Sequence, residues 1–248
     1  MNLSAWEGRS KIRSLSNLQL YIRVYTVELS NDAVLKIEQT LSIPRLSKYE
    51  NFYKDKGEPY EKSDVLMLYE RNLIISNKFF YLLNYFEVVL RNAVVQAIEI
   101  SFRCNETNSW HENEAFIRSL SRRGRYSPKS MFDSAKEKFP DSPSKMIPEL
   151  KFVFWQKMLM ANYEERIWQG CFNSIFPNAT VENRQIFYDW TDQLRELRNR
   201  IAHHEPIIFN RNLENDLEVL TKFIYCRCIN TYDFIEQSAL DLKEYLDF

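Results

Sequence analysis

The sequence LRELRNRIAHHEP, residues 194–206, holds the side chains whose types and spacing best suit chemistry. On a helix, Arg195, Asn199 and His203 recur every four residues and form one row, with Arg198 at the edge of the neighbouring apolar stripe. An arginine offers a fixed positive fork to a phosphate and its developing charge. A histidine can move a proton near neutral pH, and an asparagine can orient the imidazole or a ribose. The set suits phosphodiester cleavage without a metal ion.

An RNA substrate would bring its own nucleophile, the 2′-hydroxyl, and cleavage would leave a 2′,3′-cyclic phosphate and a 5′-hydroxyl. One histidine can hardly act as base and acid on opposite sides of one phosphate. A second copy in a C2 dimer would supply the missing group. The alternative is a solvated helix end, with His203 and His204 placed favourably at the negative end of the helix dipole.

These residues need a helix to position them, and the pattern predicts one over residues 184–204. Asn183 or Thr180 can begin it, and it must end before Pro206. Its apolar stripe spans a sector of about 60°. The stripe consists of Phe187, Trp190, Leu194, Leu197 and Ile201.

A second long element is predicted over residues 64–101, as one helix or as two with a bend near Ser76. Glu87 and Arg91 are four residues apart beside its apolar face, and Asn92 follows. We expect these three either to form a second layer of the site, reaching toward Arg198 or His203, or to be an ordinary ion pair with a polar neighbour. The apolar face consists of Leu83, Phe86, Leu90, Val94 and Ala97.

The composition predicts an all-α fold of roughly eight or nine helices. The 248 residues include only 4 Gly and 8 Pro, where average usage gives about 17 and 12, so the tight turns of β-sandwiches and dinucleotide-binding domains are scarce. We expect a helical extension over residues 1–60, including helices at 18–29 and 33–41, packed on a helical domain over residues 61–248.

We expect no disulfide bonds, no metal site and no membrane-spanning segment. The 4 cysteines lack metal-site spacing, and Cys104 with His111 supplies only two ligands. The N-terminus has no apolar signal segment, and the most apolar stretch, residues 79–90, is too short and too polar to span a bilayer. We expect a reduced cytoplasmic protein without a cofactor.

The charge is unevenly distributed, although the formal net charge is −1. Residues 118–151 hold nine basic and four acidic side chains, a local net of +5, and residues 214–248 hold three basic and eight acidic ones, a local net of −5. Residues 118–148 are predicted to be a basic, flexible insertion. Within it, residues 118–129 are either a mobile solvated loop or an RNA contact in which Tyr126 stacks on a base. The expected RNA-binding side chains are Arg118, Arg122, Arg123, Arg125 and Lys129, together with Arg195 and Arg200 on the later helix.

The 194–206 segment resembles the signature of the bacterial Abi-like (AbiD/AbiF) proteins, which belong to the HEPN superfamily. That superfamily's motif is an arginine, four to six residues, and a histidine, with a polar residue after the arginine. Arg198, Asn199 and His203 match it, and His204 also satisfies the spacing. Only Trp110 stands where a tryptophan pair is expected. Further resemblances follow in order over residues 40–210: 41–49, 68–72, 86–92, 152–155, Trp168 and 176–177.

The resemblance implies a dimeric HEPN bundle that acts as a metal-independent endoribonuclease in abortive infection, a toxin that a small noncoding RNA restrains in some members. Arg198 would hold the phosphate, His203 would be the general acid and base, and Asn199 would orient one of them. His204 and Glu205 are the next candidates. No membrane or DNA partner is implied. The rivals are an inert HEPN module that binds RNA or protein, and a protein antitoxin or scaffold.

Overall fold

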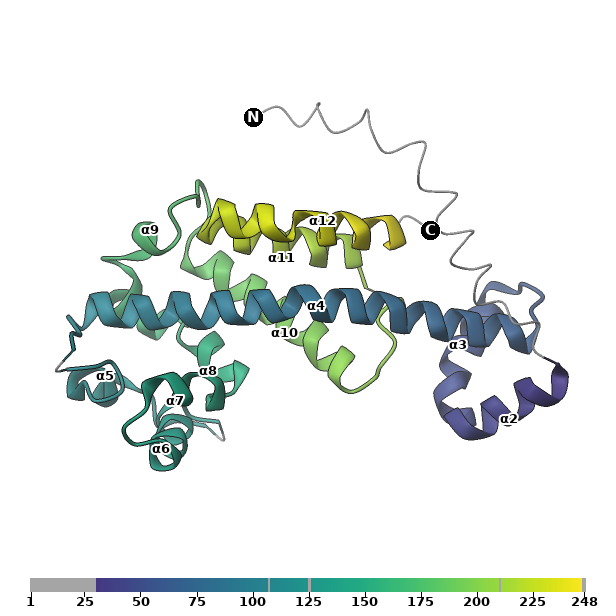
Figure 1. Ribbon diagram of the computed structural model, residues 1–248, viewed down its shortest axis with the longest axis horizontal. Coiled ribbons are helices and arrows are strands. Elements are labelled where there is room, and N and C mark those ends of the chain that lie inside the picture. The colour runs from purple at the N-terminus through teal and green to yellow at the C-terminus, as the bar shows by residue number, and fades with distance from the viewer. Residues whose placement is uncertain (1–29, 107, 125, 210, 247–248) are drawn as a thin grey trace. The chain divides into compact units, whose positions relative to one another are not determined.

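The computed structural model describes residues 30–106, 108–124, 126–209 and 211–246 (Figure 1). All regular elements in these ranges are helices, which confirms the all-α prediction. The helix expected at 18–29 lies outside the described residues. The predicted number of helices, eight or nine, roughly matches the structure. The difference arises from short helices of only four to seven residues, which a sequence pattern does not separate well.

The chain divides into two compact units, and the division falls between Ile75 and Ser76. The described part of the first unit contains α2 (Asn31–Leu41), α3 (Ile43–Lys56) and the beginning of α4 (Lys62–Ser101). α4 continues through the division as one 40-residue helix, which is the first of the two predicted alternatives. The domain boundary expected at residue 60 stays a prediction, because a continuous helix does not mark where an independently folding domain begins.

The helix α4 contains a stretch that is long and apolar enough to cross a membrane by length and composition alone. The core helix of a soluble protein passes the same test. In the second unit this helix supplies core residues, and the side chains of Phe79, Leu82, Phe86 and Leu90 are completely buried.

Aromatic rings from four segments meet in the core of the second unit. Phe86 of α4 lies 4.8 Å from Phe223 between ring centroids, and Phe187 lies 4.9 Å from the same ring. Phe176 packs 4.1 Å from Phe187. The elements of this unit after α4 are α5 (Glu114–Ser119), α6 (Pro128–Lys138), α7 (Pro143–Glu149), α8 (Phe152–Lys157), a 3-10 turn (Ala161–Tyr163), a π turn (Glu164–Trp168), α9 (Phe172–Ile175), α10 (Arg184–Ala202), α11 (Leu213–Arg227) and α12 (Ile229–Leu246).

α10 presents the candidate motif, and its ends follow from local chemistry. Asn183 begins the helix by accepting a hydrogen bond from the backbone N–H of Ile186 at 3.1 Å, one of the two starts predicted. Phe187, Leu194 and Leu197 are completely buried, so the predicted stripe faces the core. Of the polar residues between them, Thr191 is also completely buried, whereas Asp189 and Glu196 are exposed.

Residues 118–148, expected as a basic insertion, include the helices α6 and α7. Ser127 caps α6 by accepting from the N–H of Ser130, and Phe132 of this helix is completely buried. Most of the segment is therefore regular structure, and its flexibility stays a prediction.

Candidate functional site

The chain reverses direction directly after α10, at the two histidines. The N–H of His203 donates to the carbonyl of Asn199, that of His204 to Ile201, and that of Glu205 to Arg200, each at 2.9 Å. This pattern satisfies the last carbonyls of the helix. Both imidazole side chains are exposed to solvent.

His204 adopts a left-handed backbone conformation, with φ of 54°. Glycine is the usual residue at this place in a helix-ending turn, since it has no Cβ to clash. A side chain is therefore held here at an energetic cost of about 1 kcal/mol. Arg103, after α4, has a similar φ of 52°, so the conformation by itself assigns no role to His204.

The guanidinium of Arg198 faces α4 across the helix interface. Its Nε lies 4.0 Å from a carboxylate oxygen of Glu87, whose other oxygen pairs with Arg91 one turn further along α4. Glu87 and Arg91 are only 15% and 19% exposed. The structure thus unites three of the expected site residues in one half-buried cluster, while Asn92 is exposed and makes no recorded contact with it.

Arg198 and His203 leave α10 in different directions. At about 100° per residue, five residues place them about 140° apart around the helix axis. Within the described residues, no hydrogen bond or ion pair joins Arg198 to Asn199 or His203. A single chain therefore presents the arginine and the imidazole on separate faces of one helix.

Arg195 and Arg200, both expected to contact RNA, have carboxylate partners. Arg195 donates to Asp192 at 2.7 Å, and Gln156 of α8 donates to the same oxygen at 2.6 Å. Burial opposes ionisation of Asp192, but these hydrogen bonds outweigh it and lower the pKa of its carboxyl. Arg200 lies 3.8 Å from Glu205 and donates to the carbonyl of Pro206 at 2.9 Å. These two contacts of Arg200 help to hold the turn after α10.

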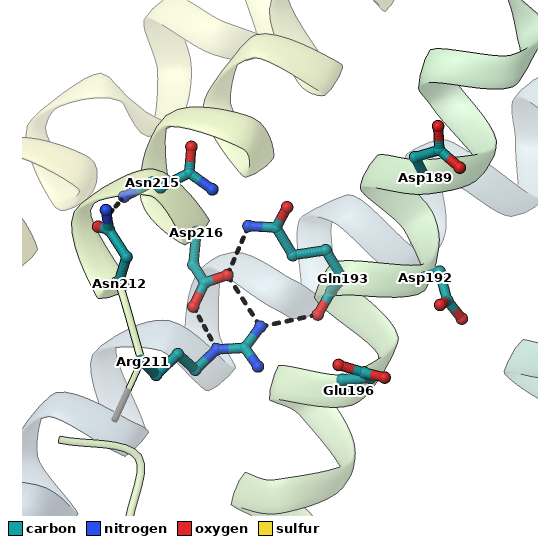
Figure 2. A pocket seen from close by; sticks show the side chains of 8 residues that line it. All are labelled: Asp189, Asp192, Gln193, Glu196, Arg211, Asn212, Asn215 and Asp216. Carbon is teal, nitrogen blue, oxygen red and sulfur yellow. Dashed lines mark hydrogen bonds and ion pairs between the residues drawn. The ribbon is translucent and has the colours of Figure 1, made fainter. Parts of the chain in front are cut away.

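A pocket of about 440 Å³ opens between α10 and the start of α11 (Figure 2). Four carboxylates and one guanidinium line it, so the pocket disfavours a phosphate group. Sequence reasoning missed it, although acidic residues at 189, 192 and 196, three and four apart, share one helix face. The lining residues are Asp189, Asp192, Gln193, Glu196, Arg211, Asn212, Asn215 and Asp216.

A buried clamp at the floor of this pocket ties the chain after the motif back to α10. Arg211 forms an ion pair with Asp216 and donates to the backbone carbonyl of Gln193 at 2.9 Å. The Gln193 amide donates to Asp216 at 2.7 Å, and Asp216 is only 1% exposed (Figure 2). The clamp and the Arg200–Pro206 contact restrain the turn that presents His203.

The basic segment is partly neutralised. Lys129 bonds to Asp133 at 2.5 Å, and Arg118 pairs with Glu114 on α5. Arg122 and Arg123 are exposed. Arg125 lies outside the described residues.

Within the described ranges, no group of three or more His, Cys, Asp and Glu side chains is arranged to hold a metal ion. The four cysteines are free. Burial raises the pKa of the Cys226 thiol to about 11, which disfavours the reactive thiolate.

Comparison with known proteins gives one match. A family model described as Abi-like protein matches residues 37–209, more than half of the chain. The matched range includes Glu87, Arg91 and the whole motif on α10. No curated protein and no solved structure matches.

Proposed function

The chain belongs to the Abi-like protein family, and from this premise we propose that it is a metal-independent endoribonuclease of the HEPN type, a toxin in bacterial abortive infection. The family suggests the defence role. The observation that supports the chemistry best concerns Arg198 of α10, the helix that ends at two exposed histidines. Its guanidinium lies beside Glu87 of α4. Phosphodiester cleavage uses both kinds of group.

In this proposal Arg198 contacts the scissile phosphate. Its side chain is 37% exposed, so the guanidinium can meet a ligand while Glu87 orients it. Arg91 and Arg198 together outnumber the single carboxylate of Glu87, so the cluster keeps one positive charge for the phosphate. His203 moves the proton, Asn199 orients the imidazole or the ribose, and His204 is the alternative histidine.

Products and cofactor requirement test this proposal directly. Purified protein should cleave RNA in excess EDTA, because none of the proposed groups needs a metal ion. The fragments should end in a 2′,3′-cyclic phosphate and a 5′-hydroxyl, which mass spectrometry identifies. DNA of the same sequence is the matched control and should stay intact, since it lacks the 2′-hydroxyl. Activity that disappears in EDTA and returns with added metal would point to a metallonuclease instead.

We further propose that the working unit is a C2 dimer. One chain offers Arg198 and His203 on different faces of α10, so two copies can assemble a site that one cannot. Sedimentation of the cleaving protein should show a dimer whose two motifs line one cleft. A fully active monomer, or a dimer with widely separated motifs, would contradict this.

The rival function is an inert HEPN module that uses Arg198 for recognition only. The lack of any Arg198–His203 contact within the chain favours it, and the cleavage assay decides between the two. RNA, as substrate or as a regulatory noncoding RNA, is the proposed partner in either case, and the bacterial cytoplasm is the proposed location.

A further inference from the structure

The fold places the loop between α5 and α6 against residues much later in the chain. Arg166 donates to the carbonyl of Ser119 at 3.3 Å, and Lys157 donates to the carbonyl of Tyr126 at 2.5 Å. The ammonium of Lys151 lies 5.7 Å from the centre of the Tyr126 ring. Three cations, from the start and end of α8 and from the π turn, thereby join Arg122 and Arg123 of the loop between α5 and α6.

We define the basic platform as the exposed loop residues Arg122 and Arg123 with the three later cations that contact this loop, Lys151, Lys157 and Arg166. Lys151 and Lys157 contact Tyr126, whose side chain is 48% exposed. Within the described part of the chain, no carboxylate forms an ion pair with any of the five. Lys157 and Arg166 are oriented by backbone carbonyls, which are neutral acceptors and leave the positive charge in place.

This set shares only Arg122 and Arg123 with the RNA-binding side chains that the sequence predicted. Arg118, Lys129, Arg195 and Arg200 each have an acidic partner. A phosphate must compete with that partner for the cation, whereas at the basic platform it meets uncompensated charge. Of the two sets, only the basic platform therefore presents positive charge without a carboxylate partner.

We propose that the basic platform binds the phosphate backbone of single-stranded RNA and that Tyr126 stacks on a base. Unpaired cations around an exposed aromatic ring fit a single strand, whose phosphates and base faces are both accessible. The inference rests on the proposed function for its choice of RNA. The platform holds RNA and takes no part in the reaction. Gln156, next to Lys157 on α8, bonds to Asp192 of α10, so RNA held here stays beside the motif helix.

Binding of a fluorescent oligouridylate at several salt concentrations tests the platform, with His203→Ala as the background so that the probe survives. Replacing Lys151, Lys157 and Arg166 together by alanine should flatten the slope of log affinity against log salt by about 2, at about 0.7 for each lost phosphate contact. Tyr126→Leu should weaken binding at least about fivefold without changing the slope, because stacking releases no counterions.

Two controls separate the platform from general effects of charge and folding. The exposed residues Lys36, Lys48 and Lys54 of α2 and α3, changed together to alanine, remove the same charge and should leave the slope unchanged. The pair Lys157→Arg and Arg166→Lys keeps the charge and should preserve binding. The circular dichroism spectrum and unfolding midpoint of the triple variant should stay close to those of the background protein, which excludes a mere folding defect.

If the triple variant keeps the slope of the unmodified platform, or if the control triple loses as much slope as the platform triple, the proposed platform is wrong. Equal binding of duplex DNA or of anionic lipid vesicles would overturn its assignment to RNA. These outcomes differ from failure of the proposed function, which appears as an absence of cleavage by the wild-type protein while the platform variants still lose oligouridylate binding.

Discussion

Replacing His203 by alanine should lower the rate of RNA cleavage by about 10²–10⁴-fold, the usual contribution of a general acid or base. Arg198→Ala should have an effect of similar size, because no other group with an uncompensated charge takes its place beside Glu87. The single-turnover rate at saturating RNA measures both effects. His203 is exposed at the end of α10, so the His203 variant should fold normally.

His204→Gly is the matched control for the choice of histidine. Glycine suits the left-handed φ of 54° at this position, so the variant should gain about 1 kcal/mol of stability and retain cleavage. If His204→Gly abolishes cleavage while His203→Ala retains it, the acid and base role moves to His204. If neither change affects cleavage, the proposed mechanism is wrong.

Glu87→Gln tests the carboxylate that faces Arg198. Glutamine keeps the size of the side chain but leaves Arg91 and Arg198 without a counter-charge. Arg198 should then be less well oriented, so the cleavage rate should fall, but by less than in Arg198→Ala. Glu87→Asp, which keeps the charge, should recover part of the rate. A purely structural role would change the free energy of unfolding and leave the rate per folded molecule unchanged.

Asp216→Ala should cost about 3–5 kcal/mol of stability, the usual effect of removing one partner from a buried ion pair. Asp216 accepts from both Arg211 and the amide of Gln193, and the change leaves these donors buried without their acceptor. Denaturant unfolding measures the loss.

The control for Asp216→Ala is Glu218→Ala, which removes an exposed acid from the same helix and should change stability by less than about 0.5 kcal/mol. A loss below about 1 kcal/mol for Asp216→Ala would show that the clamp is not needed to hold the chain that follows the motif.

The two arginine-rich regions differ in how far their sequence predicts their charge. Arg195, Arg200 and Lys129 read as phosphate ligands in the sequence, but each has a carboxylate within four or five residues. For Arg195 and Lys129 that partner could have been recognised, because residues three and four apart meet on a helix. Glu205, five residues after Arg200, lies beyond the end of α10. Lys151 and Arg166, in contrast, approach the loop only through the packing of α8 and the π turn, which no local pattern encodes.

The sequence left open whether α4 is one helix or two, and it extended α10 to residue 204, whereas the helix ends at Ala202. By itself it determined the helical class, the start and buried stripe of α10, and the motif that marks the Abi-like family. Each depends on spacing within one segment, or on the scarcity of Gly and Pro, and such local preferences persist in any tertiary arrangement. Only the tertiary structure decided that Arg198 meets Glu87, 111 residues earlier. The different directions of Arg198 and His203, in contrast, follow from their spacing of five residues on a helix. Contacts between helices depend on how they cross and on which rotamers their interface allows, and periodicity determines neither.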